Sequence, residues 1–251
     1  MKKQLFTILT VSIGIGGVLC STVAFADEIP NELQSNAIVK FLEDDSPSKP
    51  VDPVNPDPNK PVTPFDPTTP DNKPNAGTKG PLSIDFASSL DFGENKISTA
   101  DAVYKVKPQK YMTEDKKEMV GPNYVQITDK RGTLSGWTLD VKQVTPLKNG
   151  DNILEGAQIR FTNADIVTNS AAQKPSSIKK DFILNGETGS QNVLIAKDGE
   201  GAGTFVYRFG SDEATAADSI QLFIPGQSVK HKGLYQTTLN WSLKSVPLAA
   251  F

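Results

Sequence analysis

Apolar and polar residues alternate along much of the chain after residue 81. In the segment that begins at Trp137, the side chains of Trp137, Leu139 and Val141 fall on one face, and the residues between them are polar. The same alternation recurs in residues 204–209 and 235–245. A period of two residues is that of a β-strand with one buried face. The pattern therefore predicts strands.

Gly, Asn, Asp and Pro separate these segments, as turn residues separate strands. We predict strands over residues 82–86, 123–128, 137–144, 158–161, 193–195, 204–209, 220–224 and 235–245. The Gly-rich residues 197–203 predict a hairpin loop, and residues 212–218 predict a short helix or turn. Many amphipathic strands without a long helical pattern predict an all-β fold, an antiparallel β-sandwich or a barrel-like variant.

A proline-rich segment precedes these strands. Residues 46–81 hold 11 of the 18 prolines, many of them three residues apart. Proline fixes φ and lacks an amide donor, so this run is expected to form neither a helix nor a central strand. Its spacing suits polyproline II. We expect a disordered or polyproline-II spacer over 46–81, with a long surface loop as the alternative, followed by a β domain over 82–251.

A short segment, residues 27–45, lies before the spacer. Within it, residues 36–42 alternate as a strand does, whereas Leu33, Ala37 and Phe41 are four residues apart, as on a helix face. We favour a strand that docks on the main domain.

The first 26 residues resemble a secretory signal peptide. Two lysines precede an uncharged apolar run and a small-residue signal that ends at Ala26, so we expect cleavage between Ala26 and Asp27. Cleavage would remove Cys20, the only cysteine, and the mature fold would then rest on burial and hydrogen bonds without disulfides. We expect a secreted protein with no membrane span in its mature form.

Composition argues against several functions. The net charge is −3, which is a poor basis for binding nucleic acid. The only histidine, His231, lies between two lysines that disfavour both its protonation and a metal cation. Asp198 and Glu200 are too few carboxylates for a calcium loop. We therefore expect no enzyme activity, no metal and no cofactor.

Two Trp-x-Leu elements lie inside predicted strands: Trp137-Thr138-Leu139 and Trp241-Ser242-Leu243. Several flanking segments accompany them in order, namely residues 80–86, 90–93, 125–132, 201–204 and 224–226, then Tyr235, Leu239 and Pro247. Together these residues resemble the WxL domain family of Gram-positive cell-surface proteins, over essentially the whole mature chain.

The resemblance implies noncovalent attachment to the cell wall, with peptidoglycan as the ligand. It equally implies an alternative: a protein–protein module that binds a partner surface protein or host matrix such as collagen or fibronectin. Residues 245–251 carry no sortase motif, which agrees with noncovalent attachment. The implied wall- or partner-binding motif comprises Trp137, Thr138, Leu139, Tyr235, Leu239, Trp241, Ser242 and Leu243.

The same tryptophans have a structural interpretation. Trp137 shares a strand face with Leu139, and Trp241 shares one with Leu243. Burying an aromatic side chain stabilises a fold by roughly 2–3 kcal/mol. We favour core anchors, with the stacking of at least one ring on a sugar or partner as the alternative.

Overall fold

The computed structural model describes residues 32–245, so the expected signal peptide, its cleavage site and Pro247 lie outside the described residues. The chain divides into two compact units, residues 1–40 and 41–251. Residues 36–42 form no helix or strand, and their side chains are exposed, that of Ile38 by 99%. The strand predicted there is wrong, because alternation alone supplies no partner strand for its backbone.

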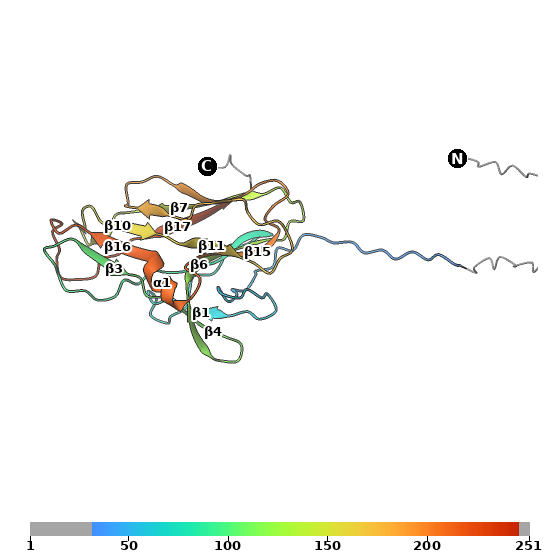
Figure 1. Ribbon diagram of the computed structural model, residues 1–251, viewed down its shortest axis with the longest axis horizontal. Helices are drawn as coiled ribbons and strands as arrows, with labels where there is room; N and C mark the ends of the chain where they lie inside the picture. Colours follow the sequence, from blue (N-terminus) through green and yellow to red (C-terminus); the bar gives the residue numbers. More distant parts are fainter. Residues whose placement is uncertain (1–31, 246–251) are drawn as a thin grey trace, which may run out of the picture. The chain divides into compact units, whose positions relative to one another are not determined.

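The second unit is built from small antiparallel sheets (Figure 1). Across the described residues, three sheets have four strands each. In spatial order they are β11 (Ala164–Val167), β15 (Gly203–Phe209), β6 (Asn123–Asp129) and β2 (Leu82–Ala87); β12 (Ser177–Ile178), β14 (Gln191–Ala196), β7 (Trp137–Gln143) and β17 (Leu239–Lys244); and β13 (Phe182–Leu184), β10 (Gln158–Phe161), β16 (Ile220–Ile224) and β3 (Ala102–Lys105).

Smaller elements complete the unit. A three-stranded sheet has the order β1 (Thr63–Pro64), β4 (Gln109–Met112) and β5 (Glu118–Gly121), and β8 (Lys148–Asn149) pairs with β9 (Asn152–Ile153). The helix α1 (Glu213–Ser219) begins where Asp212 accepts a hydrogen bond from the Thr215 amide at 2.8 Å. The all-β, antiparallel prediction is confirmed. Whether a sandwich or a barrel-like variant describes these sheets best stays a prediction.

All three four-stranded sheets contribute to one hydrophobic core. Strand β7 lies at its centre: the side chains of Trp137, Leu139 and Val141 have no exposed surface. On the opposite face of this strand, Thr138 and Asp140 are also buried. A strand buried on both faces is held rigidly, so β7 sets the position of its neighbours β14 and β17.

The proline-rich segment packs on this body. Val51 is 1% exposed; its amide donates to Gln126 Oε1 at 2.8 Å and its carbonyl accepts from the Tyr124 hydroxyl at 3.1 Å. The proline-rich segment thus lies against the β domain, as expected for the long surface loop that was the alternative to a spacer. The domain boundary at residue 82 stays a prediction. Residues between the prolines keep their amides and side chains, and these supply the contacts that the prolines lack.

Candidate functional site

The structure brings the two Trp-x-Leu elements together in one sheet. Strands β7 and β17 are antiparallel neighbours, with Leu139 opposite Leu243 and Val141 opposite Trp241. Directly opposed residues project from the same face of a sheet. The two elements, about a hundred residues apart in sequence, therefore present one continuous apolar face to the core.

The Trp137 side chain is enclosed on every side. Its ring lies 6.3 Å from that of Phe205, and its indole Nε1 donates to the Gly201 carbonyl at 3.0 Å. Gly201 has a φ of +80°, and a Cβ atom there would lie 2.5 Å from the indole nitrogen. The Gly-rich loop therefore closes over Trp137 because it has no side chain at this position. Trp137 is a core residue that no ligand can reach without unfolding the loop.

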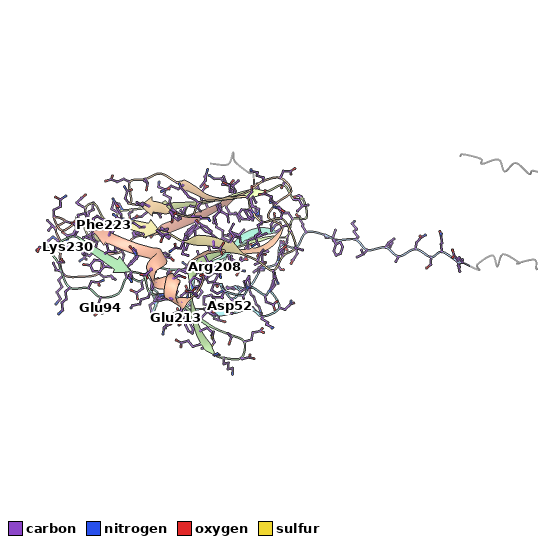
Figure 2. The ribbon with its side chains drawn as sticks, in the orientation of Figure 1. Asp52, Glu94, Arg208, Glu213, Phe223 and Lys230 are labelled. Carbon is purple, nitrogen blue, oxygen red and sulfur yellow. The ribbon has the colours of Figure 1, made fainter. Side chains whose placement is uncertain are left out.

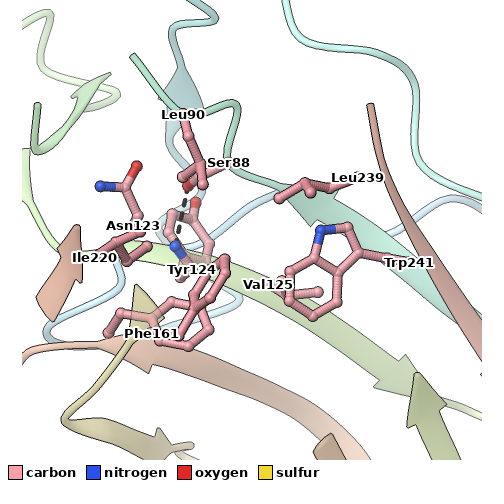
Figure 3. Close-up of a pocket in the computed structure, with 10 residues that line it drawn as sticks. Ser88, Leu90, Asn123, Tyr124, Val125, Phe161, Ile220, Leu239 and Trp241 are labelled. Atoms are coloured by element: carbon pink, nitrogen blue, oxygen red, sulfur yellow. Dashed lines mark hydrogen bonds between the residues drawn. The ribbon is translucent and has the colours of Figure 1, made fainter. Parts of the chain in front are cut away.

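Trp241 is partly buried and turns toward the same core. Figure 3 shows its ring and Leu239 beside Val125, at a cavity that Ser88 and Tyr124 also line. The cavity holds about 10 Å³, close to the volume of a single water site. A sugar ring is far larger, so this cavity is no saccharide pocket.

The other predicted motif residues have similar structural contacts. Thr138 is fully buried in β7. Ser242 lies opposite Asp140, whose carboxylate pairs with the Lys244 ammonium. Tyr235 lies outside the paired strands, where its hydroxyl accepts a hydrogen bond from the His231 amide at 2.9 Å. The structure thus unites the motif as a packing unit, and Tyr235 joins that unit by packing against the core edge.

Glu200, one of the two acidic residues weighed for calcium, also has a structural role. Glu200 accepts hydrogen bonds from the Lys197 and Ser176 amides at 2.9 Å each. Burial raises the pKa of the Glu200 carboxyl, but these hydrogen bonds outweigh it and the pKa is lowered. The carboxylate thereby fixes the loop that covers Trp137. Among residues 32–245, no group of three or more His, Cys, Asp or Glu side chains is placed to hold a metal ion.

A larger opening lies on the proline-rich side of the body. We call it the hairpin groove: it is bounded by residues 52–62, by the β4–β5 hairpin at residues 113–119, and by residues 167–169. Its volume is about 970 Å³. Figure 2 shows Asp52 and Arg208 on this side of the molecule, and Arg208 donates to the Pro53 carbonyl at 3.2 Å.

The sequence analysis missed these groove residues. Their one local signal is the series of Asp residues among the prolines: Asp52 accepts from the Val54 amide at 2.7 Å, and Asp57 from the Asn59 amide at 3.0 Å. Such short-range bonds mark turns. They give no indication that a distant hairpin forms the other side.

A family model described as WxL domain surface cell wall-binding matches residues 28–247 of the chain. This match covers the proline-rich segment, both Trp-x-Leu strands and the loops between them. The chain belongs to the WxL domain family.

As a member of this family, the WxL chain is located at the cell surface, in association with the cell wall. No curated protein and no solved structure matched the sequence significantly. In the part of the chain that the structure describes, no helix has the length and apolarity needed to cross a membrane.

Proposed function

We propose that this protein is secreted and attaches noncovalently to peptidoglycan through its β domain, without catalysing a reaction on it. The family match over residues 28–247 is the observation that carries this proposal, because the family is described as cell wall-binding. The geometry adds a reason for a rigid binding body: three sheets pack on one core, and Val51 of the proline-rich segment joins a second, smaller cluster with Phe86, Tyr124 and Val206.

The motif supports attachment indirectly. Trp137 has no exposed surface and Trp241 turns toward the core, so the paired strands hold the shape of the domain. Ligand contacts then fall on surfaces that this frame supports. The motif therefore stabilises the domain that binds, and the ligand contacts other surfaces of that domain.

Sedimentation with purified sacculi tests the proposal. Sacculi are stripped of protein with protease and of teichoic acid with hydrofluoric acid, and then mixed with the mature chain. We expect the chain to pellet with the sacculi and to stay in the supernatant with cellulose, which controls for trapping in an insoluble polysaccharide. Soluble muropeptides should not be released. A chain that stays in the supernatant with stripped sacculi contradicts wall binding, and released muropeptides contradict the noncatalytic role.

The alternative, a module for a partner surface protein or host matrix, is favoured by one observation. Residues 32–42 are exposed and rich in large apolar side chains, including Ile38, Phe41 and Leu42. Exposed apolar stretches commonly mark protein contacts. Pelleting only with unstripped walls or whole cells, or binding to immobilised collagen or fibronectin in place of sacculi, would favour this second function.

A further inference from the structure

The hairpin groove has the dimensions of a ligand site. Small-molecule and peptide sites enclose roughly 300–1,000 Å³, and this groove has about 970 Å³. The cavity at Trp241, by contrast, has about 10 Å³. The groove is therefore the opening, of these two, that can take a ligand.

Both sides of the groove are held by the fold. On the first side, the Val62 amide donates to the Pro50 carbonyl at 2.8 Å, next to the buried Val51. On the second side, the Thr113 amide donates to the Lys117 carbonyl at 3.0 Å, which closes the β4–β5 hairpin. A groove whose sides are fixed in advance binds without a large cost in ordering.

The groove carries charges of both signs on both sides. Asp57 and Lys60 lie on the proline-rich side, and Glu114, Asp115 and Lys117 on the hairpin. Among the described residues, none of these five takes part in an ion pair. Elsewhere on the surface opposite charges do pair, as Lys110 does with Glu118 at 3.0 Å. Asp52 also lines the groove, where it accepts a hydrogen bond from the Val54 amide at 2.7 Å. With it, the groove offers four carboxylates and two ammonium groups to a ligand.

The lining between these charges is mixed: Val54, Pro56, Met119 and Val167 supply its apolar part, and Asn55, Thr113, Thr168 and Asn169 its uncharged polar part. Charge complementarity selects a ligand with its own ammonium and carboxylate groups, and the apolar lining favours small methyl groups between them. A glycan strand offers mainly hydroxyl and acetamido groups. A short zwitterionic peptide matches both features.

We propose that the hairpin groove binds the peptide stems of the cell wall, through their free ammonium and carboxylate groups and their alanine methyl groups. This inference rests on the proposed function, and it assigns recognition to the peptide part of peptidoglycan. The carboxylates of Glu114 and Asp115 receive the side-chain ammonium of the stem's diamino acid. Lys60 and Lys117 receive the stem carboxylates.

The test compares two wall preparations. One is intact stripped sacculi; the other is the glycan released from the same material by an amidase that cleaves off the stems, coupled to agarose beads so that it still pellets. We expect the full mature chain to pellet with intact sacculi and to lose most of this retention on the stem-free glycan. The soluble tripeptide Ala-γ-Glu-Lys should compete for intact sacculi and should bind the chain in isothermal titration calorimetry.

A triple variant, Glu114→Gln, Asp115→Asn and Lys117→Gln, removes the hairpin charges and leaves the Thr113–Lys117 backbone bond in place. We expect about a tenfold weaker affinity for intact sacculi, because each exposed charge contact contributes little. The matched control is Glu94→Gln with Lys96→Gln, two exposed charges in a loop outside the groove (Figure 2). Retention of the control should equal that of the unchanged chain.

The outcomes separate the two proposals. If the unchanged chain pellets equally with stem-free glycan, or if the triple variant binds intact sacculi as tightly as the control, the groove assignment is overturned and wall binding stands. If the unchanged chain fails to pellet with intact sacculi, wall binding itself fails, and the groove assignment fails with it. Unchanged thermal melting of the triple variant excludes unfolding as the cause of weaker binding.

Discussion

Replacing Gly201 with alanine tests whether the Gly-rich loop is shaped by Trp137. A Cβ atom on residue 201 would lie 2.5 Å from the Trp137 indole nitrogen and 2.7 Å from the Ala196 Cβ. Ordinary contacts of this kind exceed about 3.4 Å, so the ring or the loop must move by nearly 1 Å. Overpacking of a core costs typically about 1–3 kcal/mol, and the positive φ of +80° adds roughly 1–2 kcal/mol for any residue other than glycine.

Gly199→Ala is the matched control. Gly199 lies two residues away with a φ of +84°, and a Cβ atom there meets nothing within 4 Å. The control therefore carries the backbone strain without the collision. We expect the Gly201 variant to be less stable than the Gly199 variant by about 1–3 kcal/mol in urea unfolding followed by circular dichroism. At about 2–4 °C per kcal/mol, this corresponds to melting temperatures roughly 2–12 °C apart. Equal stability of the two variants would refute close packing of the loop on Trp137.

Four further predictions concern single side chains. Trp137→Ala should lower the free energy of unfolding by about 3–5 kcal/mol, and Trp241→Ala should lower it by less, because Trp241 is only partly buried. Urea titration of both variants checks this order. If Trp241→Ala instead loses wall retention while its melting temperature is unchanged, Trp241 contacts the ligand. Val51→Ala should cost roughly 1–3 kcal/mol, because Val51 is 1% exposed; an unchanged midpoint would contradict docking of the proline-rich segment. Burial raises the pKa of the Asp85 carboxyl in the folded state, so the protonated carboxyl favours folding in acid. The free energy of unfolding of the unchanged chain, compared with that of Asp85→Asn, should therefore fall as the pH rises from 3.8, the ordinary pKa of the carboxyl, through the raised value of the folded state. Burial also raises the pKa of Asp91, but its bonds to Lys107 and the Gly93 amide outweigh this and lower it, so stability relative to Asp91→Asn should rise with pH in urea titrations between pH 2 and 5.

Strands with strict alternation were predictable from the sequence. The run that begins at Trp137 predicts a strand over 137–144, and β7 spans Trp137–Gln143. The short helix expected over 212–218 is α1 (Glu213–Ser219). Strands such as β4 (Gln109–Met112) and β11 (Ala164–Val167) were missed, because neither run alternates strictly between polar and apolar residues. The equally short β10 (Gln158–Phe161) does alternate, and it was predicted.

The docking of the proline-rich segment could not be predicted from the sequence, for a different physical reason. A high proline content indicates that a segment forms neither a helix nor a central strand, but it does not indicate which distant residues the segment contacts. Docking depends on Gln126, whose side-chain amide donates to the Lys49 carbonyl at 2.9 Å and whose oxygen accepts from Val51. These partners are 75 or more residues away in sequence. No local pattern reports such a contact, and the hairpin groove escaped prediction for the same reason.

The motif that identifies the family and the surface that binds need not coincide. In this chain the two Trp-x-Leu elements lie on the paired strands β7 and β17, and their tryptophan and leucine side chains pack in or against the core. Any substitution of Trp137 therefore destabilises the core, and weaker wall binding by such a variant would reflect loss of folded protein and not loss of a ligand contact. Weaker wall binding by variants of the charged hairpin residues would reflect lost ligand contacts, because Glu114 and Asp115 are exposed and take no part in strand pairing. Only a variant that binds the wall poorly while melting at the unchanged temperature can assign recognition to a surface, and the hairpin offers such variants where the fully buried Trp137 cannot.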